Sequence, residues 1–246
     1  SCAVFDGEHL PFIADTVNLI VVDEPGDVAR EEILRVLCPN GVAWINGQKL
    51  VKPLPGTTAG WEHFLYDASG NAVSPDTEVG VPFNIQWEAG PKWARSHDRL
   101  SSLNSLVSSD GKIFYIFDEG PTEDFYYPAT WNLICRDAYN GVVLWKRDVG
   151  KWEDHWRAFR SGPTQLNRRI VAAGNRLYTS LGLGEPVQVL DAANGATIRT
   201  LQGTEGTEEI ICKDGILYLV VLPFESEPQD YQSMYRGGSR AGLQKK

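Results

Sequence analysis

Several features that would assign a protein to a familiar class are missing from this chain of 246 residues. No apolar run approaches the roughly 18 residues that a membrane-spanning helix needs. Lys and Arg form no basic stripe and the net charge is −9, so we expect no nucleic-acid partner. The four cysteines are widely spaced, without a Cys-x-x-Cys pair or a His at ligand spacing, which argues against a metal site. No serine nucleophile elbow, His-Glu-x-x-His motif or phosphate loop occurs.

What the chain does contain favours β structure. Its 24 Gly and 14 Pro supply turns, and its 8 Trp supply large side chains for packing. Hydrophobic residues at 42% and charged residues at 22% are typical of a globular protein. The chain starts at Ser1-Cys2-Ala3-Val4, without an initiator Met or the regions of a signal peptide. We therefore expect the chain to be a processed product or a truncated reading of a longer sequence. Its expected partner is the remainder of the parent protein.

The first fifty residues predict a strand, a helix and a second strand. The apolar run over residues 17–22 ends in Asp23 and Glu24 and predicts a strand buried on both faces. Asp27 is the expected N-cap of the helix, and residues 38–41, Cys-Pro-Asn-Gly, are expected to end it. A second buried strand follows over residues 42–45. Strand, helix and strand together predict one parallel α/β unit.

These residues resemble the second half of a class I S-adenosylmethionine-dependent methyltransferase, in the stretches DGEHLPFIADTVNLIVVDE and EEILRVLCPNGVAWI. The resemblance implies that Asp6 contacts the adenine amine and that Asp23, with Glu24, faces the substrate side of the sheet. The family's first strand and glycine-rich loop are missing, Asn18 replaces an Asp, and Asn40 replaces a Gly. Half a site cannot orient a substrate for methyl transfer, so we expect a remnant. A methyltransferase whose cofactor-binding half lies upstream is the alternative.

A different pattern repeats after a linker rich in Pro, Gly and Thr at residues 51–60. The stretch CRDAYNGVVLW aligns with VLDAANGATIR, and both contain Asp-Ala-x-Asn-Gly. Predicted strands that end at Tyr115 and Tyr178 precede the two copies, and a third ends at Tyr218. Asp-x-x-Asn-Gly predicts a hairpin turn in which the Asp accepts hydrogen bonds within the turn and the Gly has a positive φ. Repeated strands with such turns predict the blades of a propeller.

The repeat resembles that of pyrroloquinoline-quinone (PQQ)-like, quinoprotein-type β-propellers. The resemblance assigns structural signature positions to Asp137, Asn140, Gly141, Trp145, Asp191, Asn194 and Gly195, with Arg199 in place of a second Trp. Trp87 resembles the closing Trp of an earlier, more degenerate blade. The implied fold class is mainly β: a partial propeller of three or so blades over residues 61–224, behind a short methyltransferase-like α/β segment at residues 1–50. Large bacterial proteins combine these two parts, so we expect a fragment of one, from an exported parent, with a flexible tail at residues 225–246.

Three expectations follow from the propeller resemblance. Trp145 should be buried between blades, whereas Arg199 should be exposed. Quinone-dependent dehydrogenases of this fold need a vicinal Cys pair, which this sequence lacks. We therefore expect the chain to bind neither PQQ nor S-adenosylmethionine nor a metal. A quinoprotein dehydrogenase is the second alternative for its function. A ring of so few blades should stay open and self-associate through edges near Trp61, Trp87 and the strand over residues 216–221.

Two insertions in the first repeat are candidate ligand-binding loops. One is acidic and aromatic, over residues 118–131, and the other is aromatic and basic, over residues 151–163. Facing one another, they would form a polar and aromatic wall for a small molecule or peptide from Trp152, His155, Trp156, Arg157, Arg160, Glu123 and Asp124. In this arrangement Asp118 and Glu119, with the other two acidic residues, would complement the two arginines. The alternative is a solvated acidic loop beside aromatic side chains that fill the space between blades. A third candidate is residues 93–102, with Arg95, His97, Asp98 and Arg99.

We expect no catalytic residues in this chain. The sequence therefore predicts a non-catalytic ligand-binding or scaffolding fragment of a PQQ-like propeller protein.

Overall fold

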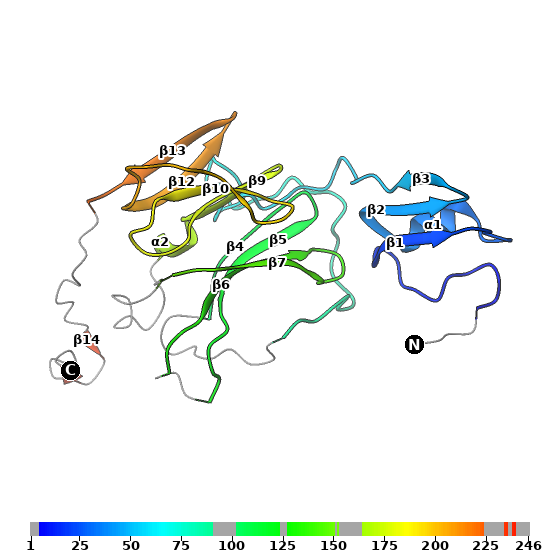
Figure 1. Cartoon of the computed structure of the whole chain (residues 1–246), viewed down its shortest axis with the longest axis horizontal. Helices are drawn as coiled ribbons and strands as arrows, with labels where there is room; N and C mark the ends of the chain where they lie inside the picture. The colour runs from blue at the N-terminus through cyan, green and yellow to red at the C-terminus, as the bar shows by residue number, and fades with distance from the viewer. Residues whose placement is uncertain are drawn as a thin grey trace.

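The computed structural model describes residues 5–90, 102–123, 127–150, 152 and 164–223, and the backbone of residues 234–235 and 238–239. In these residues the protein is mainly β, with several antiparallel sheets and one parallel pair of strands. Figure 1 shows the parallel pair with its helix at one end of an elongated molecule and the larger antiparallel sheets toward the other. Neither of the two described helices is long and apolar enough to cross a membrane.

The predicted strand-helix-strand unit forms near the N-terminus. It consists of β1 (Val17–Val22), α1 (Arg30–Val36) and β2 (Leu37–Ile45), and β1 pairs with β2 in parallel. A fourth element, β3 (Gln48–Val51), pairs antiparallel with β2 and ends where the predicted linker begins. Ile33 and Leu37 are buried with Ala43 of β2 between α1 and one face of this sheet. Acidic residues in the first turn of α1 and Arg35 in its last turn match the helix dipole.

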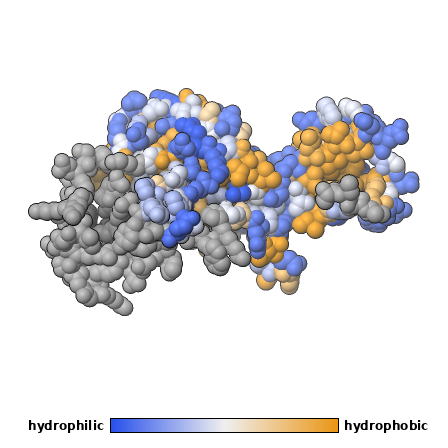
Figure 2. Space-filling view, turned by 60° about the horizontal axis from the view of Figure 1, so that its bottom comes forward, coloured by the Kyte–Doolittle hydropathy of each residue, from blue (hydrophilic) through white to orange (hydrophobic). Residues whose placement is uncertain are grey.

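The prediction that β1 is buried on both faces is wrong. The register of the sheet places Leu19, Val21, Trp44 and Val51 on the face that points away from α1. Leu19 is 62% and Val21 64% exposed, because α1 covers one face only and no described element covers the other. Figure 2 shows an apolar surface on this part of the molecule.

The predicted boundaries of the helix are also wrong. Ala29, not Asp27, occupies the N-cap of α1, without a side-chain cap hydrogen bond. Residues 38–41 do not form a turn after the helix, because β2 begins directly at Leu37 and contains them. The pairing with β1 is irregular at this point, and Asn40 has a φ of +66°. The Asn40 N–H still donates to the carbonyl of Lys52 at 2.8 Å, so the chain continues as a strand.

Two four-stranded antiparallel sheets contain the sequence repeats. The first sheet consists of β4 (Leu103–Ser109), β5 (Lys112–Asp118), β6 (Trp131–Asp137) and β7 (Val143–Asp148). After α2 (Thr164–Asn167), the second sheet consists of β8 (Ile170–Ala173), β9 (Arg176–Ser180), β10 (Val187–Asp191) and β11 (Thr197–Thr200). β12 (Thr207–Lys213) and β13 (Ile216–Val221) form a third sheet, and β14 (Met234–Tyr235) pairs with β15 (Gly238–Ser239). The three predicted strands are confirmed as β5, β9 and β13, but they do not end at Tyr115, Tyr178 and Tyr218, because each continues for two or three residues in the pairing with its neighbour.

The three sheets that follow one another in the chain stack through their faces. β8 contacts both β4 and β12, so the first strands of successive sheets are neighbours. The largest core lies between the first and second sheets and includes Phe114, Leu133, Trp145, Ile170, Leu177 and Leu190. A smaller core joins Val171 and Val187 of the second sheet to Ile210 of the third. This order of strands and sheets is consistent with a propeller-like β fold.

Both Asp-x-x-Asn-Gly turns have the predicted hairpin chemistry. In the first turn the Asp137 carboxylate accepts the N–H of Tyr139 at 2.8 Å, and Gly141 has a φ of +72°. In the second turn the Asp191 carboxylate accepts the N–H of Ala193 at 2.7 Å, and Gly195 has a φ of +73°. The turns connect β6 to β7 and β10 to β11.

A tryptophan packs on the glycine of each turn. The indole N–H of Trp145 donates to the carbonyl of Ala192 at 3.1 Å, and a Cβ atom on Gly195 would lie 2.6 Å from the ring. Trp145 is 8% exposed and Arg199 is exposed, so both predictions are confirmed. Trp87 makes the same contact with the turn that ends in Gly141, although residues 52–90 form no regular strand.

We expect Trp145→Ala to lower the free energy of unfolding by about 3–5 kcal/mol, the usual cost of deleting a large buried aromatic side chain. Arg199→Ala, at the equivalent position of the second repeat, should change it by less than about 0.5 kcal/mol because the side chain is exposed. Urea unfolding of both variants tests this difference. Equal effects of the two substitutions would contradict the packing described here.

Candidate functional site

A short segment that begins at Gly60 crosses the first strands of the stacked sheets. The carbonyl of Trp61 accepts the N–H of Ser108 in β4 at 2.8 Å, and the carbonyl of Glu62 accepts the N–H of Ala172 in β8 at 3.0 Å. A Cβ atom at Gly60 would lie 2.8 Å from the Ser108 carbonyl, so this close approach requires glycine. The segment thus connects the first two sheets on the side where their first strands meet.

His63 extends this connection to the third sheet. Its side chain is buried, and its Nε2 atom accepts the N–H of Cys212 in β12 at 3.1 Å. Burial lowers the pKa of His63, while the nearby Asp67 carboxylate acts in the opposite direction. A neutral ring that accepts at Nε2 carries its proton on Nδ1, and Nδ1 has no hydrogen-bond partner among the described residues. His63 therefore presents an unused hydrogen-bond donor.

A pocket of about 260 Å³ lies beside His63. Residues 63–70 supply one side of it, and Arg168 and β12 supply the other. Its apolar lining residues are Phe64, Leu65, Ala68, Ile210 and Ile211, and its charged or polar side chains are His63, Asp67, Arg168 and Glu209. An apolar pocket with a few polar groups is the usual form of a small-molecule site.

The charged groups of the pocket are paired within the protein. Arg168 and Glu209 form an ion pair at 3.1 Å, and both side chains are partly exposed. The Asp67 carboxylate accepts the hydroxyl and the N–H of Ser69, which lower the pKa of Asp67. The pocket is therefore lined by one imidazole, two carboxylates and one guanidinium. No group of three or more metal-ligating side chains occurs in the described part of the chain.

Sequence reasoning missed this pocket. His63 and Cys212 are 149 positions apart, and no spacing in the sequence connects them. One feature of the sequence could have helped to locate the pocket. The predicted repeats imply that the first strands of successive sheets lie side by side. The segment over residues 60–63 that crosses those strands has no repeat pattern of its own.

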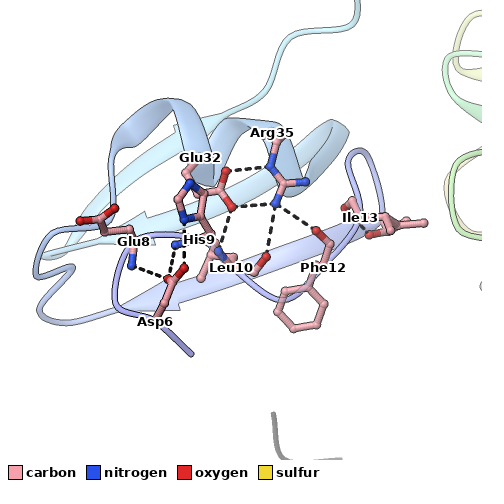
Figure 3. A network of polar contacts seen from close by, with 9 residues as sticks. Asp6, Glu8, His9, Leu10, Phe12, Ile13, Glu32 and Arg35 are labelled. Carbon is pink, nitrogen blue, oxygen red and sulfur yellow. Dashed lines mark hydrogen bonds and ion pairs between the residues drawn. The ribbon is translucent and has the colours of Figure 1, made fainter. Parts of the chain in front are cut away.

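The predicted cofactor residue Asp6 belongs to a network at the N-terminal unit (Figure 3). Its carboxylate accepts the N–H groups of His9 and Glu8, which lower the pKa of Asp6 to about 2, and it also contacts His9 Nδ1 at 3.0 Å. In the same network Arg35 of α1 pairs with Glu32 at 2.6 Å and also donates to carbonyls of residues 10 and 12. These contacts tie the segment before β1 to α1. Asp23 and Glu24 are exposed directly after β1.

The predicted wall between the two insertions falls largely outside the described residues. This applies to Asp124, His155, Trp156, Arg157 and Arg160, and likewise to Arg95, His97, Asp98 and Arg99 of the third candidate. Glu123 is exposed. Trp152 is fully buried in the core between the first two sheets. This is the position expected in the alternative in which aromatic side chains fill the space between blades. The wall itself stays a prediction.

The two acidic residues at the start of the first insertion stabilise the first sheet. Asp118 is buried and accepts the N–H groups of Gly120 and Thr130. Glu119 pairs with Lys146 at 2.6 Å and accepts the side-chain amide of Asn132 at 2.8 Å. Neither residue contributes to the pocket at His63.

The first Asp-x-x-Asn-Gly turn also holds the N-terminal unit. The side-chain amide of Asn18 in β1 donates to the Asp137 carboxylate at 2.6 Å, and that of Asn140 donates to the carbonyl of Thr16 at 3.0 Å. Cys38 lies at the same contact, where burial and the Asp137 charge raise the pKa of its thiol to about 11. Two signature residues of the repeat thus have a second structural role.

Comparisons with known proteins add little to this description. No protein-family model and no curated protein matches the chain. Among solved structures, a europium-containing methanol dehydrogenase matches with 11% identity and a TM-score of 0.39. The match covers 58% of this chain and 23% of that chain. The propeller-like description of the fold therefore rests on the strand order and the contacts between sheets given above.

The buried His63 should make folding stability depend on pH. Its pKa is lower in the folded protein than in the unfolded chain, so the unfolded state binds more protons as the pH falls through about 6.5. We expect its contribution to be complete above that pH and to be lost progressively below it. Urea unfolding between pH 5 and pH 8 measures this, with His63→Gln as the control that removes the titration. Identical pH profiles for the two proteins would contradict the assignment of His63 as a buried neutral side chain.

Proposed function

We propose that this chain is a non-catalytic, ligand-binding part of a propeller built from quinoprotein-like repeats, and that the pocket beside His63 is its binding site. One observation carries the proposal: His63, whose buried Nδ1 atom has no hydrogen-bond partner among the described residues, belongs to the lining of a pocket with both apolar and charged side chains. A buried polar atom without a hydrogen-bond partner lowers the stability of the folded protein. A ligand that accepts a hydrogen bond from this atom removes that cost. The pocket therefore favours a ligand with a hydrogen-bond acceptor.

The other groups of the pocket narrow the class of ligand. Hydroxyl groups both accept and donate, so a polyol can accept from His63 Nδ1 while it donates to the carboxylates of Asp67 or Glu209. Phe64 and Leu65 supply apolar surface for the carbon face of such a molecule. The volume of about 260 Å³ suits a single sugar unit more than a larger ligand. We therefore propose a monosaccharide or the terminal unit of a glycan.

Titration with D-glucose and D-mannose, followed by the NMR signals of the His63 imidazole, tests this proposal. We expect a saturable shift of the Nδ1 resonance in the millimolar range. Ala68→Phe should abolish the shift because it fills the pocket without removing a polar group. Ala193→Phe, in the exposed second turn, is the matched control and should leave the shift unchanged. No saturable shift with either sugar, or equal effects of the two substitutions, would overturn the assignment.

A second candidate is binding of S-adenosylmethionine by the N-terminal unit, and the parallel pairing of β1 with β2 around α1 favours it. The Asp6 carboxylate already accepts three hydrogen bonds, which leaves one acceptor position on Oδ2 for an adenine amine. The glycine-rich loop of that family has no counterpart in the sequence.

We expect isothermal titration with S-adenosylmethionine to show no binding at micromolar concentrations. Binding in that range, lost in Asp6→Ala, would place the methyltransferase alternative first. The quinoprotein dehydrogenase alternative has no specific observation in its favour, since the sequence contains no adjacent cysteines.

A further inference from the structure

We propose that Asn46 is a site of spontaneous deamidation, in which its side-chain amide reacts with the backbone nitrogen of Gly47 and is converted to a carboxylate. The proposal concerns a covalent modification of the N-terminal unit and does not depend on the pocket at His63. It rests on the exposed turn that contains this Asn-Gly pair and on the contacts that hold the other three Asn-Gly pairs of the chain.

Asn46 and Gly47 form the two-residue turn between β2 and β3. Ile45 and Gln48 pair across the turn, and both turn residues have a positive φ, +48° for Asn46 and +76° for Gly47. In a hairpin of this type the flanking pair forms the closing hydrogen bonds, so the N–H of Gly47 lies outside the ladder. Asn46 and Gly47 are both exposed. The two groups that would react are therefore in contact with solvent.

The reaction requires these two residues and water. The Gly47 nitrogen bonds to Cγ of Asn46, the bond from Cγ to Nδ2 breaks, and ammonia leaves with the proton of the Gly47 N–H. Glycine favours this step because it has no Cβ atom to hinder the approach of its nitrogen. Water then opens the cyclic imide. Opening at Cγ gives an ordinary aspartate, whereas opening at the main-chain carbonyl gives isoaspartate, and neither route needs an oxidant or a reductant.

The two Asn-Gly pairs in the Asp-x-x-Asn-Gly turns are hydrogen bonded at both reacting groups. In the second turn the side-chain oxygen of Asn194 accepts the N–H of Ala196 at 2.8 Å, and the N–H of Gly195 donates to the carbonyl of Asp191 at 2.8 Å. The equivalent bonds of the first turn are both 3.0 Å long. A tryptophan ring also packs on the glycine of each turn. Either pair must therefore leave its turn before it can react.

The fourth pair, Asn40 and Gly41, is held within β2. The side-chain amide of Asn40 donates to the Asp110 carboxylate at 3.2 Å. Gly41 is buried, and a Cβ atom there would lie 2.6 Å from the carbonyl of Cys38. This packing opposes the backbone rotation that ring closure requires. The glycine is buried in all three of these pairs, whereas Gly47 is exposed.

The two products differ in their effect on β3. An ordinary aspartate reproduces the Asp-Gly turns between β4 and β5 and between β12 and β13, where Asp110 and Asp214 have φ values of +48° and +50°. Isoaspartate instead lengthens the backbone of the turn by one carbon atom. Ile45 and Gln48 could then no longer close the hairpin in their present register. We therefore expect the isoaspartate product to loosen β3.

Mass spectrometry of digests, after incubation of the full chain at mildly alkaline pH, measures conversion at all four pairs. We expect the rate at Asn46 to exceed the rates at Asn140 and Asn194 by at least about tenfold, because two hydrogen bonds must break at each of those sites before reaction. The same incubation in guanidinium chloride that unfolds the chain is the control, and the four rates should converge there. A rate at Asn46 no greater than that at Asn194 in the folded chain, or a difference that persists after unfolding, would overturn the proposal.

Hydrogen exchange of β3 tests the consequence. Amides of β3 should exchange faster in the incubated chain, in proportion to its isoaspartate content. Asn46→Asp is the matched control, because it carries the ordinary product and should exchange like the fresh unsubstituted chain. Unchanged exchange of β3 in isoaspartate-containing chains, or equally fast exchange in Asn46→Asp, would contradict the effect assigned to the lengthened turn.

Discussion

The contact between a tryptophan ring and a turn glycine is the constraint on which the arrangement of the sheets depends. The indole of Trp145 lies so close to Gly195 that any side chain there would have to displace it. The same glycine has a positive φ, which closes the hairpin between β10 and β11. One residue therefore satisfies two requirements: it shapes a turn within the second sheet and it accepts the side chain that joins this sheet to the first.

The aspartate of each turn holds the loop that the indole contacts in a fixed conformation. By accepting backbone N–H groups of its own turn, Asp137 or Asp191 fixes the loop onto which the indole packs. In the first turn the free oxygen of Asp137 also receives the amide of Asn18. An aspartate at position 18 would place two carboxylates together at this contact, which is unfavourable. An amide at position 18 therefore suits the contact with Asp137.

The pocket at His63 is a consequence of how the sheets meet. Residues 60–63 can bridge β4 and β8 only because stacking brings those strands together, and His63 reaches β12 for the same reason. The N–H of Cys212 donates to the His63 imidazole and not to another strand, and Nδ1 has no hydrogen-bond partner among the residues that the structure describes. The bond that holds the His63 ring also determines which of its nitrogens carries the proton.

The sequence by itself determined the features that depend on neighbours within a few residues. Local patterns of apolar and turn-forming residues predict the strands β1, β5, β9 and β13, the existence of α1 and the two Asp-x-x-Asn-Gly turns. The burial of Trp145 was implied by the resemblance of the repeat to propeller repeats. Tertiary structure decided the remainder. Three features depend on groups far apart in the chain. These are the exposure of the second face of β1, the inclusion of residues 38–41 in β2 and the hydrogen bond between His63 and Cys212. A local pattern shows that a side chain is apolar or can form a hydrogen bond. Which residue it contacts or bonds to depends on how the sheets pack.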